Sequence, residues 1–277
     1  MPSASVIIPA HDEAKVIGRL LAGLLEEAAD DEFDVLVVAN GCADDTAAVA
    51  AGYGVRVLET PVPSKREALR LGDGAARAHP RVYVDADVEL RTADLRALRD
   101  ALAGGVLAAA PERALALADR PWPVRAYYAV WTRLPAVREG LFGRGVIAVS
   151  AEGNRRLMAL PPVMGDDLAA SLAFAAGERR VVRSARAVIH PPRTLADLLR
   201  RRVRAVTAVA EIERGPVAGQ EARTGPRDLL GVAGRAPWLL PHLAVFLAVT
   251  LVARARARRA VRAGDYTTWL RDESSRT

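Results

Sequence analysis

Cysteine and aromatic residues are scarce in this sequence, and each scarcity argues against a class of structure or partner. Cys42 is the single cysteine, so an internal disulfide framework is excluded. Aromatic residues make up 5% of the chain and are not interleaved with the arginines, which argues against base-stacking platforms and so against nucleic acid as a partner. The N-terminus lacks the basic, apolar and small-residue order of a secretory signal, and we therefore expect a reducing, cytoplasmic location.

Basic charge is plentiful but unevenly distributed. Residues 1–60 hold eleven acidic and three basic side chains, a balance of −8, so the net charge of +6 leaves +14 on residues 61–277. The basic part predicts an anionic partner, either a diphosphate or anionic lipid headgroups. With 277 residues, 51% of them hydrophobic, the chain suits one large α/β unit with an appendage.

Short apolar runs alternate with helical patterns over the first ninety residues. The runs read as buried strands at residues 5–9, 34–39, 55–58 and 82–84. Polar turns and capped helices between them predict a parallel sheet with helices on its faces. His11, Asn40 and Asp85 each follow a strand, and ligands bind at the carboxyl ends of such strands, so we expect one site to gather these residues.

Four residues in the first two turns also have a structural explanation. Asp12 can cap the helix that follows it, and Glu13 falls in that helix's first turn, where the helix dipole favours negative charge. Asp44 or Asp45 can cap the next helix in the same way. For these carboxylates a structural and a functional role both remain open.

Asp85 and Asp87 follow the strand at 82–84 and, if the chain stays extended, project to the same side. Two carboxylates so placed are suitable ligands for Mg²⁺ or Mn²⁺, with phosphates of a substrate completing the coordination. A solvated acidic turn is the alternative for so short a motif. Lys65, one of two lysines against thirty-seven arginines, begins a helix where its charge opposes the dipole, which a phosphate would offset; an ordinary surface lysine is the alternative.

Four segments in order over residues 4–90 resemble the successive signatures of family 2 glycosyltransferases with the GT-A fold: 6–14, 37–46, 64–68 and 84–88. The resemblance, to a member of actinobacterial type, implies an α/β fold of Rossmann-like character. Its sheet is expected to be mostly parallel with helices on both faces, followed by a C-terminal helical extension. It also implies a nucleotide-sugar donor and a metal on the donor diphosphate.

The resemblance assigns roles to individual residues. It implies that donor-binding residues are Pro9, Ala10, His11, Glu13, Asn40, Lys65, Asp85, Ala86 and Asp87, with Asp85 on ribose or metal and Asp87 on the metal. One departure concerns the base: the family often has an aspartate at the end of the second strand, whereas this chain has Ala39-Asn40. The identity of the nucleobase therefore stays open.

The middle of the chain is expected to provide the acceptor side. Residues 121–131 read as core or as an acceptor groove, and the turn Gly143-Arg144-Gly145 resembles a segment that shapes the acceptor site in the family, although its glycines also permit the turn itself. Asp166-Asp167 either cap a helix or resemble the family's Glu-Asp motif. In the second case Asp167 is the general base that deprotonates a sugar hydroxyl, and direct displacement inverts the anomeric carbon.

Three further residues each have more than one interpretation. His190 ends another strand and is either structural or an additional metal ligand. Arg201 and Arg204 are in register with the Gln-x-x-Arg-Trp element of processive members, but Ala205 replaces the tryptophan, which disfavours a polymerase. The two arginines clamp the diphosphate, meet an anionic membrane, or belong to a solvated basic helix.

Residues 236–253 contain His242 as their only strongly polar member and are followed by arginines at 254, 256, 258, 259 and 262. A span needs about 20 apolar residues, and a single span would place the arginines outside the cell. We therefore expect a helix in the inner leaflet with its arginines on headgroups, and a protein peripheral on the inner face of the cell membrane; a helix packed on the domain is the alternative.

The sequence thus predicts a donor half at 1–110, an acceptor half at 111–210, a linker at 211–228 and a C-terminal helical segment at 229–277. The expected function is that of a metal-dependent, inverting hexosyltransferase that moves one sugar from a nucleotide-diphosphate sugar to a saccharide or lipid-linked acceptor, in polysaccharide or glycolipid biosynthesis. Two alternatives are a sugar-phosphate nucleotidylyltransferase, whose glycine-rich basic loop is absent from residues 9–13, and a non-catalytic membrane-associated nucleotide-sugar-binding protein.

Overall fold

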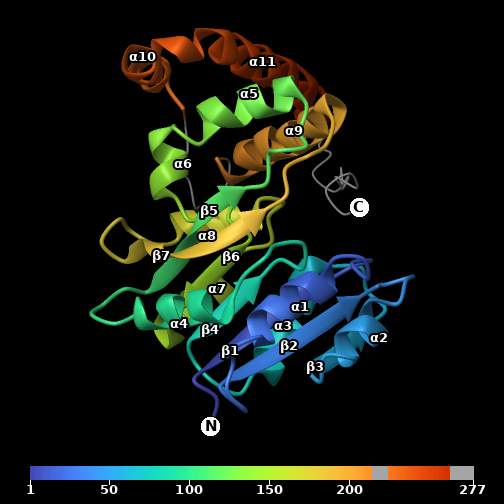
Figure 1. Cartoon of the computed structure of the whole chain (residues 1–277). Coiled ribbons are helices and arrows are strands. Elements are labelled where there is room, and N and C mark those ends of the chain that lie inside the picture. Colours follow the sequence, from blue (N-terminus) through green and yellow to red (C-terminus); the bar gives the residue numbers. More distant parts are fainter. Residues whose placement is uncertain (214–223, 263–277) are drawn as a thin grey trace.

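A computed structural model of the chain describes residues 1–213 and 224–262, with side chains to residue 259. Seven strands form one sheet in the order β3-β2-β1-β4-β6-β5-β7 (Figure 1). The strands are β1 (Ala4–Ala10), β2 (Phe33–Asn40), β3 (Arg56–Thr60), β4 (Arg81–Val84), β5 (Ala108–Leu115), β6 (Val146–Val149) and β7 (Arg179–Ile189). All neighbouring pairs are parallel except those of β6, which runs antiparallel to β4 and β5. The predicted α/β class with a mostly parallel sheet is confirmed.

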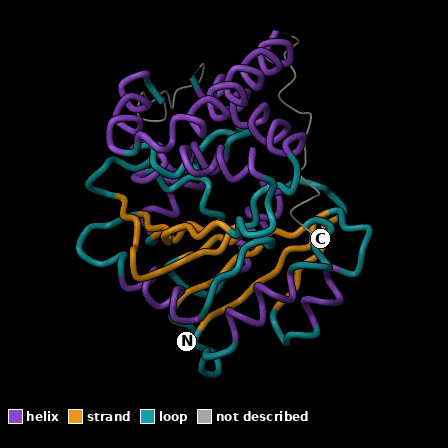
Figure 2. Tube along the Cα trace, turned by 45° about the horizontal axis from the view of Figure 1, so that its top comes forward, coloured by secondary structure: helices purple, strands orange, loops and turns teal. Residues whose placement is uncertain are grey.

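Helices cover both faces of this sheet, as Figure 2 shows. They are α1 (Ile17–Leu25), α2 (Thr46–Ala51), α3 (Lys65–Ala75), α4 (Thr92–Asp100), α5 (Trp122–Trp131), α6 (Pro135–Glu139), α7 (Ala151–Met158), α8 (Asp166–Leu172), α9 (Leu195–Ile212), α10 (Pro226–Arg235), the 3-10 turn η2 (Pro237–Leu239) and α11 (Leu240–Arg262). Alternate side chains of β1 point to opposite faces: Val6 and Ile8 join the core under α1, and Ile7 joins the core on the other face. The apolar run of β1 is therefore buried on both sides.

The predicted start of the first helix is wrong. Helix α1 begins at Ile17 rather than directly after Asp12. Asp12 adopts a left-handed conformation (φ 51°), and its Oδ1 accepts a hydrogen bond from the Ala43 N–H at 2.7 Å. Asp12 therefore joins the loops after β1 and β2 instead of capping α1.

The two predicted halves share the sheet. The division at residue 110 falls within β5, which starts at Ala108. At the other predicted boundary, α9 continues to Ile212 and α10 begins at Pro226, while residues 214–223 of the expected linker and 263–277 of the expected C-terminal segment lie outside the described residues.

The C-terminal helices form a layer with α5 and α9 at one end of the molecule (Figure 1). Phe246 of α11 stacks on Tyr127 of α5 with ring centroids 5.0 Å apart, and Ala253 and Ala257 of α11 pack against Val203 of α9. By length and composition only, the helix at Pro237–Arg259 is apolar enough to cross a membrane, and 28% of its most apolar window is buried.

Asp34, a buried carboxylate near the amino end of β2, is expected to contribute to the stability of the fold. Asp34 accepts hydrogen bonds of 2.8 Å from Ser5 Oγ, Arg56 Nη1 and the Arg77 N–H. Burial alone would raise the pKa of Asp34, but these donors outweigh it and hold the pKa below its usual value. We expect Asp34→Asn to lower the free energy of unfolding by about 3 kcal/mol, because it removes the charge of a buried carboxylate that accepts three hydrogen bonds, one of them from the partly exposed Arg56.

Urea denaturation at several pH values checks this expectation. The folded-state pKa lies below the unfolded value, so the stabilisation is present above about pH 4 and is lost as the pH falls through the folded-state pKa. The matched control is Asp30→Asn, the same change at an exposed position. Equal unfolding midpoints for the two variants at pH 7 would contradict the assignment.

Candidate functional site

Three elements distant in sequence meet at Lys65. Its ammonium lies 2.8 Å from Asp85 Oδ1 and 3.0 Å from Asp166 Oδ2. Lys65 is placed by α3, whose N-cap Ser64 accepts a hydrogen bond from the Glu67 N–H. Asp85 follows β4, and Asp166 begins α8. The structure thus brings one predicted donor-binding pair and the predicted acidic motif to the same point.

The electrostatics of this group depend on the ammonium. Burial opposes the charge on Lys65, but Asp166 and Asp85 outweigh burial and raise its pKa, so Lys65 is a cation at neutral pH. Burial raises the pKa of Asp85, and Asp87 adds repulsion against the attraction of Lys65. A divalent cation beside Asp85 and Asp87 would relieve that repulsion, and carboxylates are the ligands that Mg²⁺ and Mn²⁺ prefer.

The chain turns after β4 instead of staying extended, and the Val88 N–H donates to the Asp85 carbonyl at 3.4 Å. Asp85 and Asp87 are partly exposed, while Ala86 and Val88 are buried in the core. Ala86 therefore contributes packing, and only the two carboxylates are available to a ligand. Gly145 lies directly against them: its carbonyl accepts the Asp85 N–H at 2.7 Å, and a Cβ there would come within 2.4 Å of Val88. This contact places Gly145 beside Asp85, and its role in contacting the acceptor or the diphosphate stays a prediction.

His190 pairs with the carboxylate of Glu89. Its Nε2 lies 2.7 Å from Glu89 Oε1, and Glu89 also meets Arg19 Nε at 3.3 Å. Within the described parts of the chain, Asp85, Asp87 and His190 do not bring ligand atoms within 4.8 Å of one another. The predicted three-residue metal set is therefore not assembled, and the two carboxylates with substrate phosphates are the set that fits.

Asp167 accepts a hydrogen bond from the turn Gly143-Arg144-Gly145. Its Oδ2 accepts the Gly143 N–H at 2.9 Å, where Gly143 has φ 64°. The carbonyl of the same peptide bond, that of Phe142, accepts Arg113 Nη2 at 3.0 Å. The 142–143 peptide therefore lies between a carboxylate and a guanidinium, and Arg113 is a site residue that the sequence reasoning missed.

Arg113 is fixed by further contacts. Its Nη2 also donates to the Val137 carbonyl at 2.8 Å, and its guanidinium lies 4.7 Å from the ring centroid of Trp131. Burial and the nearby Arg144 lower its pKa, while Asp167 acts against that shift. The one sequence feature that could have revealed it is an adjacent charged pair, Glu112-Arg113, in the strand Ala108–Leu115, whose other residues are apolar.

Two predicted binding residues are instead structural. Arg144 is 2% exposed and donates to the carbonyls of Pro111, Arg138 and Gly140, so its guanidinium holds the turn and is not presented to an acceptor. Asn40 is 3% exposed, and its Nδ2 donates to the Ala10 carbonyl at 2.7 Å. Both side chains therefore donate to backbone carbonyls of other segments.

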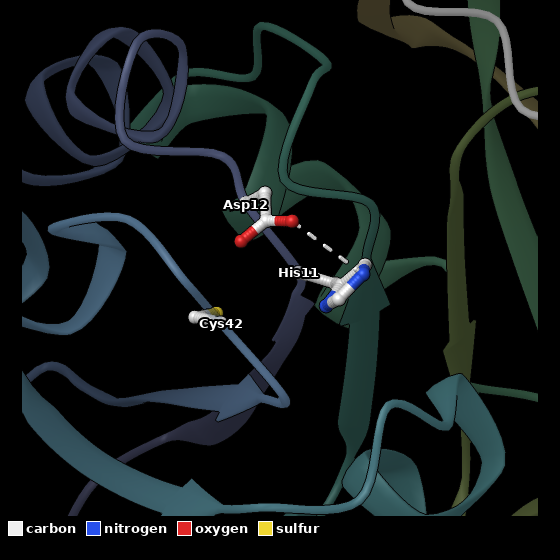
Figure 3. A group of neighbouring side chains, drawn as sticks. All are labelled: His11, Asp12 and Cys42. Carbon is white, nitrogen blue, oxygen red and sulfur yellow. Dashed lines mark ion pairs between the residues drawn. The ribbon is translucent and has the colours of Figure 1, made fainter.

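The loop after β1 presents few side chains. Pro9 and Ala10 are buried strand residues, and Glu13 is 5% exposed with its N–H donating to Thr46 Oγ1. His11 is only partly buried and turns toward Asp12 and Cys42, the next loop's cysteine (Figure 3). Of the predicted residues in this loop, His11 is the one whose side chain is most available to a ligand.

Arg201 and Arg204 are carried by α9, which begins at the N-cap Thr194. Burial and Arg201 lower the pKa of Arg204, whereas Asp167, Asp166 and Asp85 oppose that shift. Arg204 therefore lies within electrostatic reach of the acidic cluster, where it can meet an anionic group of a substrate.

Comparisons with known proteins bear on the family and the fold of this chain. The family model described as Glycosyl transferase family 2 matches residues 5–154. The 4,4'-diaponeurosporenoate glycosyltransferase of Staphylococcus aureus is 35% identical over 92 residues, 31% of this chain and 24% of that protein. An uncharacterized glycosyltransferase of Mycobacterium tuberculosis is 31% identical over 124 residues, 44% of this chain and 55% of its own length. The chain thus aligns with only a quarter to about half of these relatives.

Two solved structures show the same fold. The mannosyltransferase PcManGT from Pyrobaculum calidifontis, in complex with GDP-Man and Mn²⁺, has a TM-score of 0.62 at 21% identity and covers 96% of this chain and 81% of its own. Glucosyl-3-phosphoglycerate synthase from Mycobacterium tuberculosis, in complex with Mn²⁺, UDP and glucosyl-3-phosphoglycerate, has a TM-score of 0.57 at 22% identity, covering 75% of this chain and 78% of its own.

Proposed function

The chain belongs to glycosyl transferase family 2, and from that premise we propose that it is a metal-dependent glycosyltransferase that uses a nucleotide-diphosphate sugar. The observation that carries the proposal is the meeting of Lys65, Asp85 and Asp166, with Asp87 beside them and Asp167 adjacent to Asp166 in the chain. The solved structures of similar fold, which contain Mn²⁺ with GDP-Man or with UDP, support the choice of ligands. We further propose transfer of one sugar, with inversion, to a saccharide or lipid-linked acceptor.

The residues divide the chemistry between them. Asp85 and Asp87 would hold Mg²⁺ or Mn²⁺, which when bound supplies positive charge to the donor diphosphate. Lys65 adds a fixed cation beside the same carboxylates. Asp167, held through Oδ2 by the Gly143 N–H, accepts the proton of the attacking hydroxyl. Direct attack by that hydroxyl needs no enzyme nucleophile and inverts the anomeric carbon.

A thermal-shift screen against UDP, GDP and dTDP sugars tests the proposal. Donor at about 100 times its Kd stabilises the folded state by about 2.7 kcal/mol, which corresponds to a rise in Tm of about 5–10 °C for a chain of this size. We expect that rise for one base only, and only with Mn²⁺ or Mg²⁺ present. Asp87→Asn should lose it, and the exposed control Asp30→Asn should keep it. A shift that is independent of metal, or none with any donor, would refute the proposal.

We also propose that the protein lies on the anionic inner face of the cell membrane through α11. One face of α11 packs on α5 and α9, but the outward face is apolar and exposed, as at Leu240 (58%), Leu247 (43%) and Leu251 (62%). Exposed arginines at 254, 256, 258 and 259 continue the helix. An apolar face followed by cations suits burial at the headgroup boundary.

Helix α9 connects this surface to the site, which favours a lipid-linked acceptor. Helix α9 packs Val203 against Ala253 and Ala257 of α11, and it also carries Arg204 toward Asp166. An acceptor anchored in the membrane beside α11 would therefore approach the acidic cluster along α9.

Flotation with vesicles tests the membrane proposal. We expect the protein to bind vesicles rich in anionic lipid, and we expect salt to weaken that binding. The double change Leu247→Glu with Leu251→Glu should weaken it at least about tenfold, since burying two leucines in the lipid contributes about 3 kcal/mol or more. The matched control Glu26→Gln lies on an exposed turn after α1. Unchanged binding in the double variant, or retention after alkaline extraction, would contradict a peripheral helix.

A further inference from the structure

Three metal-binding side chains from two loops meet where β1 and β2 end (Figure 3). One ligand atom each from His11, Asp12 and Cys42 lies within 4.8 Å of the other two, and no other group of three such residues in the described part of the chain meets this spacing. The set combines an imidazole nitrogen, a carboxylate oxygen and a thiol sulfur. Such mixed sets bind Zn²⁺, whereas Mg²⁺ and Mn²⁺ prefer oxygen ligands.

The orientation of His11 suits a ligand. Its Nδ1 lies 2.7 Å from the backbone carbonyl of Asn40. A carbonyl only accepts hydrogen bonds, so Nδ1 carries the proton and Nε2 is the nitrogen that can bind a metal. A backbone carbonyl on the other ring nitrogen is the usual partner of a metal-binding histidine, because it fixes the tautomer and the ring.

Asp12 is oriented in the same manner. The Ala43 N–H holds Oδ1 at 2.7 Å, and Oδ2 is the oxygen turned toward His11 Nε2, 3.6 Å away. Two ligands at about 2.0–2.1 Å from a tetrahedral Zn²⁺ lie about 3.3 Å apart, so this pair needs an adjustment of only a few tenths of an ångström. Cys42 Sγ, 3.5 Å from the Ala10 carbonyl, completes the group from the second loop.

We propose that His11, Asp12 and Cys42 form a Zn²⁺ site, separate from the carboxylates Asp85 and Asp87, with its fourth position open to water. Binding transfers the Cys42 thiol proton to solvent, so occupancy increases with pH. The site itself does not depend on the proposed glycosyl transfer. If that function holds, however, the site lies on the loops expected to hold the nucleoside, and Zn²⁺ and the donor would exclude each other.

The single cysteine makes the test direct, because thiol titration of the full chain reports Cys42 alone. We expect Zn²⁺ to slow the reaction of Cys42 with Ellman's reagent, and Mg²⁺ or Mn²⁺ at the same concentration to leave the rate unchanged. His11→Ala and Asp12→Ala should each weaken Zn²⁺ protection by about tenfold or more, by analogy with the loss of other metal-site contacts. The control Asp45→Ala changes an exposed residue of the loop that holds Cys42, and this variant should keep the Zn²⁺ protection.

Cobalt provides a second readout. We expect Co²⁺ to give a near-ultraviolet thiolate-to-cobalt band that is absent in Cys42→Ser. Protection that survives in both His11→Ala and Asp12→Ala would show zinc on the thiol only and overturn the proposal, as would equal protection by Mg²⁺. The thermal shift caused by the donor tests the proposed function separately. If Zn²⁺ protects Cys42 but does not reduce that shift, the zinc site stands and the expected position of the nucleoside is wrong.

Discussion

Asp167→Asn is expected to lower kcat about 10³-fold with little change in donor affinity, because a general base contributes about 10²–10⁴-fold. Asparagine keeps the size of the side chain and can still accept the Gly143 N–H through its carbonyl oxygen, so the turn at 142–143 should persist. What is lost is the group that takes the hydroxyl proton. Initial rates with saturating donor, together with donor Kd from calorimetry, measure the two effects separately.

The adjacent carboxylate provides the contrast. Asp166 forms an ion pair with Lys65 at 3.0 Å, so Asp166→Asn disturbs the group next to the donor diphosphate and should change donor affinity as well as kcat. Full kcat in Asp167→Asn, or an equal loss of donor affinity in the two variants, would remove Asp167 from the role of base and leave it as a residue of the α8 start.

Much of this site could be predicted because each of its residues is next to a local signal. Lys65 follows a capping serine and two prolines, Asp85 ends a buried strand, and Asp166 begins a helix. Strand ends converge in a parallel sheet whatever the loops between them do. The sequence therefore singled out each of these residues, although it did not predict that the ammonium of Lys65 lies between two carboxylates.

The residues that escaped prediction are those whose partners are backbone groups. Arg144 and Asn40 were taken for ligand contacts, but each donates to carbonyls of distant segments. A helix cap was one of the two roles left open for Asp12, but its Oδ1 accepts a hydrogen bond from the Ala43 N–H. A backbone carbonyl leaves no mark in the residue pattern, so such contacts are visible only once the chain is folded.

Arg113 is the most consequential of the missed residues, and its replacement is expected to have the second large effect. Arg113→Met removes the donors to the Phe142 and Val137 carbonyls, so the 142–143 peptide loses the contact that opposes Asp167. A misplacement of about 1 Å at a reacting group costs about 10²-fold in rate. We therefore expect kcat to fall by about that factor while KM for the donor stays within about twofold.

The kinetic measurement must show whether Arg113 positions Asp167 or only stabilises the fold. Arg138→Met makes the same chemical change at an exposed side chain of α6 and should leave kcat unchanged. Arg113→Lys can restore one of the two hydrogen bonds and should recover part of kcat. If Arg113 merely stabilises the fold, Arg113→Met would lower the urea midpoint and the folded fraction, but kcat per folded molecule would equal that of the parent. That outcome would show that Asp167 keeps its position without the guanidinium, and that the turn is held by Arg144 and the left-handed Gly143 alone.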